Sequence, residues 1–180
     1  MITEKSMRAN LRNVFTSGTP EQIRAGLDWY LEEQNDVVLL AREYGKTAEQ
    51  VAAAMAHMSP KTPWKRNKAM TRELLATGTT RGMSGPIGRA KLALVSDNPV
   101  EEINGPKTSS FAKNLLGRYE TVTVDVWAYR AACPSGNVEK MGVREYRVIE
   151  AAYRATAKHF GVSPAQFQAA VWVIIRGAAK

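Results

Sequence analysis

The sequence predicts an all-α protein, and three observations support that prediction. First, threonine or serine stands three residues before glutamine at three places where an apolar run begins, which is the pattern of a helix capping box. These pairs are Thr19 with Gln22, Thr47 with Gln50, and Ser163 with Gln166. Second, apolar residues recur at steps of three and four along most of the chain. Third, the one β-branched run, 121–124, has no second run to pair with, and a single strand forms no sheet.

The first half of the chain is expected to contain four helices. Residues 1–18 are interpreted only as a polar and basic segment. The expected helices then cover 20–45, with an interruption near Asn35 left open, followed by 51–58, 64–75 and 87–95. The many alanines of 51–58 favour close packing of that helix against its neighbours. Residues 76–86 are expected to form a loop because glycine and proline are frequent there.

The second half begins with one further helical turn at 99–103, and four helices are expected after it. The first starts at Lys107 after Gly105-Pro106 and ends at Gly117, and an extended run at 121–124 follows. The next starts after Asp125 and ends at the turn 134–137. The last two cover 143–160, which is clearly amphipathic, and 164–177. No internal repeat is visible, and the total is about eight to ten helices.

The charge of the chain indicates the kind of partner it binds. The 180 residues carry a formal net charge of +8, while the apolar fraction of 44% and the charged fraction of 23% are those of a globular protein. A basic protein of this kind is suited to a polyanion, and nucleic acid is the most common polyanion in the cell. Basicity without any specific partner is the alternative that composition leaves open.

Several classes of site are excluded by composition. Cys133 is the only cysteine, so neither an intrachain disulfide nor a four-cysteine metal cluster is available. His57 and His159 are far apart in sequence and have no partner at ligand spacing, so no metal site and no cofactor are predicted. No run approaches the ~18 apolar residues of a membrane span, and no apolar signal segment follows the first charges. We expect a cytoplasmic protein that does not enter a membrane.

Lys107 and Asp125 are the residues whose positions suggest chemistry. Lys107 is the second residue of its predicted helix, where the positive end of the helix dipole disfavours an ammonium and makes the neutral amine more available as a nucleophile. Asp125 is placed as an N-cap, accepting from backbone N–H groups of the helix that it precedes. A solvated surface lysine and a carboxylate that serves only as a cap are the alternative interpretations.

The spacing of these two residues resembles the core of the helix-hairpin-helix DNA glycosylase superfamily, endonuclease III class. Gly105-x-Lys107-Thr108 is followed, 18 positions after the lysine (125 − 107), by Val124-Asp125 and then Arg130. The family reads Leu-Pro-Gly-x-Gly-x-Lys-Thr-Ala, then a helix, then Val-Asp-Thr-His-x-x-Arg. Three further segments are similar to family segments in the same order. They are 58–61 with 67–69, Ala90-Lys91, and 172–177. The sequences of residues 59–64 and 124–127 also resemble those of uncharacterised actinobacterial-phage proteins.

The resemblance implies a two-lobed helical fold. We expect one compact unit over 1–180, with a central lobe at 46–132 that contains the hairpin (about 99–117). The second lobe would combine 1–45 with 133–180. The implied partner is double-stranded DNA, whose target base is flipped into a pocket between the lobes, and the chain is expected to act as a monomer.

The resemblance also implies roles for individual residues. Asp125 would stabilise positive charge that develops on the deoxyribose or position the nucleophile, and Lys107 would attack C1′ and form a Schiff base. DNA contacts would come from the hairpin at Asn104 and Gly105 and from other polar residues. Those further residues are Thr108, Lys61, which stands where the family places a residue near the gap left by the flipped base, and Arg130, for which a salt bridge is the alternative. Trp127, two residues after Asp125, is the candidate to stack on the flipped base, and a place in the core is the alternative interpretation.

The sequence departs from the family pattern at two important places. Ile103-Asn104-Gly105 stands where the family has Gly-x-Gly, so the hairpin can bend differently and contact phosphate less well. Val126-Trp127 replaces Thr-His beside Asp125. These departures leave two alternatives open. One is a DNA-binding protein on the same scaffold without catalysis, and the other is a helical interaction protein. The target base is not determined by the sequence.

The remaining aromatic residues and Cys133 are interpreted as packing groups. Trp64 and Trp172 are predicted to belong to the core, and Trp29 is predicted to pack on a helix face. Cys133 is expected to be a buried small apolar residue.

Overall fold

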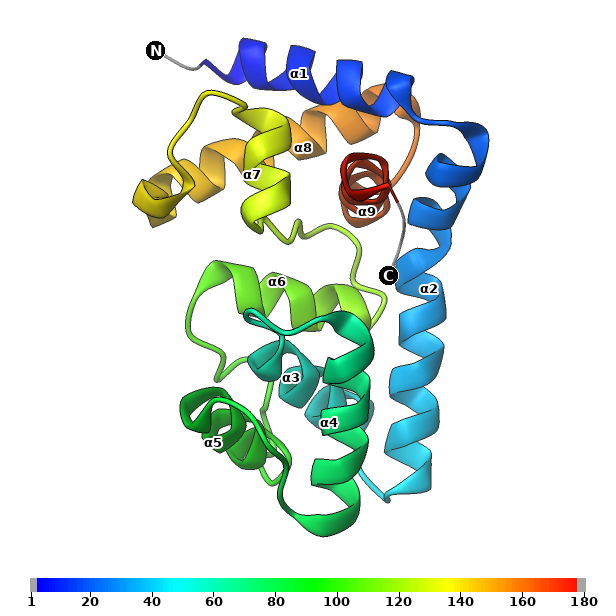
Figure 1. Cartoon of the computed structure of the whole chain (residues 1–180), viewed down its shortest axis with the longest axis vertical. Coiled ribbons are helices and arrows are strands. Elements are labelled where there is room, and N and C mark those ends of the chain that lie inside the picture. Colours follow the sequence, from blue (N-terminus) through cyan, green and yellow to red (C-terminus); the bar gives the residue numbers. More distant parts are fainter. Residues whose placement is uncertain (1–2, 178–180) are drawn as a thin grey trace. The chain divides into compact units, whose positions relative to one another are not determined.

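The computed structural model describes residues 3–177, and within them every regular element is helical (Figure 1). The α-helices are α1 (Glu4–Ser17), α2 (Pro20–Glu43), α3 (Ala48–Met58), α4 (Trp64–Thr77), α5 (Ser84–Ala93), α6 (Pro106–Leu115), α7 (Val126–Ala132), α8 (Val143–Phe160) and α9 (Pro164–Arg176). A short 3₁₀ helix, η1 (Val138–Lys140), precedes α8. No strand occurs among these described residues, so the all-α prediction is confirmed.

The chain divides into two compact units. The first contains the chain up to Leu31 and from Arg118 onward, and the second contains Glu32–Gly117. The sequence predicts boundaries between the lobes at 45/46 and 132/133, whereas the contacts between residues place the boundaries of the two units within α2 and directly after Gly117. The first boundary falls inside α2 because the helix continues through Asn35 without interruption.

The first unit is built from α1, α7, α8 and α9 with the beginning of α2. Its core holds a cluster of phenylalanines and tyrosines, in which Phe15 packs on Phe160 and Phe167 at ring-centroid distances of 4.6 and 4.9 Å. A close approach of α2 and α9 depends on Gly26, because a Cβ there would lie 2.2 Å from the Ala170 Cα. A backbone atom cannot move aside as a flexible side chain can, so this contact requires glycine.

The second unit is organised around α3. Every residue from Val51 to Ala56 is fully buried, and α4, α5 and α6 contact this helix (Figure 1). The small side chains of the alanines allow these close contacts on all sides of the helix, as the sequence predicted. Asn67 of α4 is buried among them and donates to the Met55 carbonyl at 2.9 Å, which fixes α4 against α3.

Two of the three predicted capping boxes are present in full. The Thr19 and Thr47 hydroxyls accept from the N–H of the glutamine three residues on, and each glutamine side chain accepts from the threonine N–H in return. Ser163 differs, because the Gln166 side-chain oxygen accepts from the serine hydroxyl and its amide donates to the Leu27 carbonyl. Gln166 therefore connects α9 to α2 instead of completing the cap.

Helix α1 is not among the helices that the sequence predicts. Met7, Leu11 and Phe15 occur every fourth residue and are all buried, Val14 packs beside them, and most of the other residues of the helix are polar. Thr3 and Ser6 cap it reciprocally. The apolar spacing was visible in the sequence, but three apolar positions among many polar ones form a weak signal.

The β-branched run between α6 and α7 is an extended connection, as expected. Val122 and Val124 are fully buried in the core of the first unit, and the run has no strand partner. Burial of alternate side chains anchors the connection, which ends at Asp125.

Candidate functional site

Asp125 is the N-cap of α7, as the sequence predicted. Its Oδ1 accepts hydrogen bonds from the N–H groups of Trp127 at 3.0 Å and Ala128 at 2.8 Å. The side chain is half-buried. Two backbone donors on one oxygen fix the orientation of the carboxylate, and the positive end of the α7 dipole favours its negative charge.

Two buried tyrosines of α8 hold the chain on either side of Asp125. The Tyr146 hydroxyl accepts from the Val124 N–H at 3.1 Å and donates to the Val122 carbonyl at 2.6 Å. The Tyr153 hydroxyl donates to the Ala128 carbonyl at 3.1 Å. Burial, together with the nearby charge of Asp125, raises the pKa of Tyr153 well above its ordinary value, so this hydroxyl stays protonated and remains a donor.

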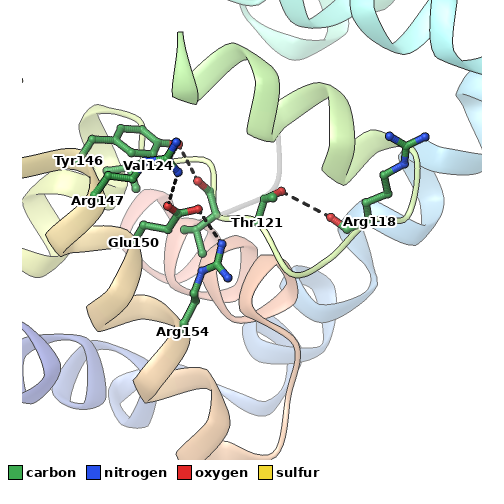
Figure 2. Close-up of polar contacts among 8 residues, drawn as sticks. Arg118, Thr121, Val124, Tyr146, Arg147, Glu150 and Arg154 are labelled. Atoms are coloured by element: carbon green, nitrogen blue, oxygen red, sulfur yellow. Dashed lines mark hydrogen bonds and ion pairs between the residues drawn. The ribbon is translucent and has the colours of Figure 1, made fainter. Parts of the chain in front are cut away.

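A charged cluster on α8 lies beside the Tyr146 contact (Figure 2). Glu150 is buried, and its two carboxylate oxygens accept from Arg147 at 2.8 Å and Arg154 at 3.0 Å. Burial acts to raise the pKa of Glu150, but hydrogen bonds from the two arginines and their charges outweigh burial and lower it. Both arginines are largely exposed, so the buried carboxylate is neutralised from the protein surface.

Trp127 is covered by arginines. The guanidinium carbons of Arg130 and Arg176 lie 5.3 and 5.6 Å from its ring centroid, and Arg176 also lies 5.0 Å from the centroid of Trp172. Trp29 extends the series, because its ring centroid is 5.8 Å from that of Trp172. The three indoles are half-buried and the two arginines are exposed. We call Trp29, Trp127, Trp172, Arg130 and Arg176 the arginine–tryptophan cluster. It combines positive charge with flat aromatic surface on the first unit.

The second unit contains the segment for which the hairpin was predicted. Gly105 has a φ of +100°, which only glycine adopts easily, and nothing lies within 4 Å of the position that a Cβ would take. Pro106 is the first residue of α6 and Lys107 the second, as predicted, and the side chain of Lys107 is half-buried. The turn before the hairpin is held by hydrogen bonds from Glu102 N–H to the Asn98 carbonyl and from Ile103 N–H to the Val100 carbonyl. Ile103 is buried, so this apolar residue, rather than a glycine, anchors the hairpin.

Lys61 occupies an unusual backbone conformation in the turn between α3 and α4. Its φ is +54°, the only positive φ of a non-glycine residue in the described part of the chain. The Thr62 N–H donates to the Ser59 carbonyl at 3.2 Å, which closes a β-turn with Pro60 and Lys61 at its centre. Glycine or asparagine normally takes the second central position of such a turn, and a left-handed conformation costs other residues about 1–2 kcal/mol.

The predicted site residues are divided between the two units. Asp125, Trp127 and Arg130 belong to the first unit. Lys61, Asn104, Gly105, Lys107 and Thr108 belong to the second. Within the first unit the structure brings Trp127 and Arg130 into contact and joins Asp125 to the backbone of Trp127.

Sequence reasoning missed three residues that shape the first unit's site. Tyr146 and Tyr153 were recognised only as part of an amphipathic pattern, yet their hydroxyls fix the chain around Asp125. Arg176 was noted only as part of the segment 172–177 and was given no role, although it lies over Trp127. No local pattern predicts these contacts, because they join α8 and α9 to α7. The packing predictions for Trp29 and Cys133 agree with the structure, and burial raises the pKa of the Cys133 thiol to about 11. Trp64 and Trp172, which were predicted to belong to the core, are only half-buried.

The described part of the chain provides little for two other kinds of site. Among residues 3–177, no helix is both long enough and apolar enough to cross a membrane. Over the same residues, no three side chains of histidine, cysteine, aspartate or glutamate gather as a metal-binding group.

These features define an all-α protein of two helical units with a capped aspartate and an arginine–tryptophan cluster on one of them. The chain belongs to the family described as "Family of unknown function (DUF7178)", whose model matches residues 1–179. No curated protein and no solved structure matches the chain.

Proposed function

We propose that the protein is a DNA-binding base-excision enzyme that cleaves the N-glycosidic bond of a flipped base and also has Schiff-base lyase activity. The observation that carries the proposal is the Asp125 carboxylate, which is fixed by two backbone hydrogen bonds at the start of α7 beside a cationic aromatic surface. A carboxylate in a fixed position stabilises the positive charge that develops on deoxyribose as the base leaves. The sequence resemblance to helix-hairpin-helix glycosylases supports the same chemistry.

Lys107 would supply the covalent step. Its neutral amine attacks C1′ while the N-glycosidic bond breaks, the base leaves with the bonding electron pair and takes up a proton, and the amine loses its protons to solvent. The C1′–O4′ bond then breaks as the nitrogen lone pair forms the C=N bond, and O4′ leaves with the bonding electrons and takes up a proton. An imine between Nζ and C1′ remains. Lys107 lies at the start of α6, directly after Gly105 and Pro106, which is the position that the sequence resemblance assigns to the nucleophilic lysine.

Binding of duplex DNA would depend on positive charge and on the hairpin. The net charge of +8 favours a polyanion, and exposed Arg130 and Lys61 are suited to phosphate contacts. Gly105 gives the hairpin the backbone conformation that precedes α6, and the backbone near Asn104 and Thr108 would face phosphate. The protein would act in the cytoplasm of a bacterium or of a phage-infected host cell.

Borohydride trapping on duplex DNA with an abasic site tests the lyase step. The wild-type protein is expected to give a covalent adduct, because borohydride reduces the imine to a stable amine. Lys107→Gln should give none, and Lys113→Gln, which changes another lysine of α6, is the matched control that should retain it. An absent wild-type adduct, or one that survives in Lys107→Gln, contradicts the role of Lys107.

A panel of duplexes, each carrying one modified base, tests base release and identifies the target. Release from at least one duplex by the wild-type protein, and none by Asp125→Asn, is the expected result. Duplex binding should be retained by this variant, since the aspartate is not a phosphate contact.

The two arginines that lie over Trp127 favour a second candidate function, that of a DNA-binding protein without catalytic activity. A base that stacks on this indole has to displace Arg130 or Arg176, since both guanidiniums lie over the ring. A protein that only binds DNA needs no such displacement, because the arginines can contact phosphates where they are. Salt-dependent duplex binding with no release from any duplex of the panel would favour this candidate.

A further inference from the structure

A pocket of about 180 Å³ lies within the second unit, among α3, α4 and α5. Its floor is apolar and consists of the buried side chains Met58, Met70 and Ile87. Met83 and the prolines Pro63 and Pro86 form its sides. The volume suits a single ring system rather than a long chain or a drug-sized ligand, which needs about 300 Å³ or more.

The rim of the pocket is positively charged. Lys61 and Arg66 both line it and are exposed, and none of its ten lining residues is acidic. Within residues 3–177, neither of these two cations forms an ion pair. The charge of Arg89 also acts on this part of the unit, since burial and Arg89 together lower the pKa of His57, the residue before Met58. An anion at this rim would therefore meet two cations and no opposing carboxylate.

The backbone at Lys61 is a further sign of function. A lysine in the left-handed region stores strain, and such strain is concentrated at ligand-binding positions. The conformation occurs at the residue that brings positive charge to the rim of the pocket.

We propose that this pocket binds a nucleotide, with its base against Met58, Met70 and Ile87 and its phosphate between Lys61 and Arg66. Methionine sulfur makes favourable contacts with aromatic rings, and three methionines line this pocket. Arginine pairs with phosphate through two parallel hydrogen bonds, and lysine adds a point charge. The ligand would consist of a flat base joined through a sugar to a phosphate. It could be a free mononucleotide or one nucleotide of a single strand. This site lies in the second unit, and it requires neither Asp125 nor Lys107.

Methyl NMR of the full chain with ¹³C-methyl methionine tests the proposal with adenosine monophosphate as the probe. A base on the floor should shift the methyl signals of Met58, Met70 and Met83 by its ring current, with saturation at a Kd of about 1 mM or tighter. The methyls of Met7 and Met55, which are buried and do not line the pocket, are expected to stay unmoved. No shift of the three pocket methyls at saturating probe overturns the proposal.

Probes that lack one part of the ligand separate the two contacts. Ribose 5-phosphate lacks the ring and adenosine lacks the phosphate, and each should bind about tenfold or more weakly than the monophosphate. Equal binding of ribose 5-phosphate would mean that the site recognises only an anion, which rejects the proposal. A short single-stranded oligodeoxyadenylate distinguishes the two sources. Shifts with both ligands indicate a site open to a strand, and shifts with the mononucleotide alone indicate a free nucleotide.

Two glycines provide matched variants. A Cβ at Gly82 would lie 2.8 Å from the Met70 Cε and 3.3 Å from the Ile87 Cδ1, so Gly82→Ala pushes flexible side chains into the pocket. Nothing lies within 4 Å of a Cβ at Gly88 on α5, so Gly88→Ala is the control. Gly82→Ala and Arg66→Gln should each weaken binding of the monophosphate about tenfold or more, and Gly88→Ala should leave it unchanged. Unchanged binding in both Gly82→Ala and Arg66→Gln places the ligand elsewhere and overturns the proposal.

Discussion

The Tyr146 hydroxyl accepts a hydrogen bond from the Val124 N–H at 3.1 Å, and this contact holds the residue directly before Asp125 (Figure 2). The same hydroxyl donates to the Val122 carbonyl at 2.6 Å, so one side chain satisfies two backbone groups of an extended segment. Backbone groups in such a buried segment have neither a helix nor a sheet to pair with. The position of Asp125 therefore depends on α8, which follows it in the chain.

Tyr146→Phe should loosen the segment before Asp125. The substitution leaves two buried backbone groups without the hydroxyl, which is expected to lower the free energy of unfolding by about 1–3 kcal/mol. Chemical denaturation measures this loss, and hydrogen exchange of the Val124 amide should become faster at the same time. Tyr153→Phe is the control, because its hydroxyl donates to the Ala128 carbonyl instead. Equal acceleration of Val124 exchange in both variants would contradict a specific role for Tyr146.

Substitutions of Asp125 should separate its structural role from its chemical role. Asparagine is as good an N-cap as aspartate, so Asp125→Asn should leave the free energy of unfolding within about 0.5 kcal/mol of the wild type. Asp125→Ala removes the acceptor for two N–H groups and should cost about 1 kcal/mol. Both variants should lose base release, because the negative charge is absent in each. If Asp125→Asn still releases the base, Asp125 serves only as a helix cap and has no role in the chemistry.

Glu150 should make stability depend on pH in the acid range. Its pKa in the folded protein is lower than the value of 4.5 expected when the chain is unfolded. The unfolded state then binds more protons than the folded state between the two values. The contribution of Glu150 is therefore fully present above pH 4.5 and is lost as the pH falls through the folded pKa. Thermal unfolding measured at a series of pH values should show this decline.

Glu150→Gln tests the assignment of that decline. The variant cannot ionise at this position, so its stability should fall less steeply below pH 4.5 than that of the wild type. It should also be less stable at neutral pH by about 1–3 kcal/mol, since the hydrogen bonds from Arg147 and Arg154 lose their charged acceptor. Glu120→Gln, at an exposed carboxylate, is the control and should leave the slope unchanged. Identical slopes for Glu150→Gln and the wild type would show that another group controls acid stability.

Lys61→Gly should weaken ligand binding without weakening the fold. Glycine adopts the positive φ at this position without strain, so the free energy of unfolding should stay the same or rise by up to about 1 kcal/mol. The same substitution at Lys65, the second residue of α4, should instead lower the free energy of unfolding by up to about 1 kcal/mol, because glycine is a weaker helix former than lysine. Denaturation curves of the two variants provide the comparison. A clear loss of stability in Lys61→Gly would mean that the lysine side chain supports the turn.

Local sequence patterns were sufficient to predict much of this protein. Short-range spacing predicted the all-α class, the starts of α2, α3 and α9, and the caps at Thr47 and Asp125. It could do so because helix periodicity and capping involve residues within about four positions of one another. Helix α1 was not predicted because only three of its side chains, Met7, Leu11 and Phe15, are buried, and three positions give a weak periodic signal. The sequence also identified Gly105-Pro106-Lys107 as a helix start for the same local reason.

The tertiary structure decided what surrounds those residues. Nothing near Trp127 in the sequence predicts Arg176, which reaches it from α9, and nothing near Asp125 predicts the two tyrosines of α8. The pocket of the second unit likewise combines α3, α4 and α5. Contacts of this kind depend on how helices pack, and packing is set by shape complementarity summed over many side chains rather than by any short pattern. The sequence by itself therefore determined the helices and their caps, whereas only the tertiary structure determined which side chains meet around Asp125, Trp127 and Lys61.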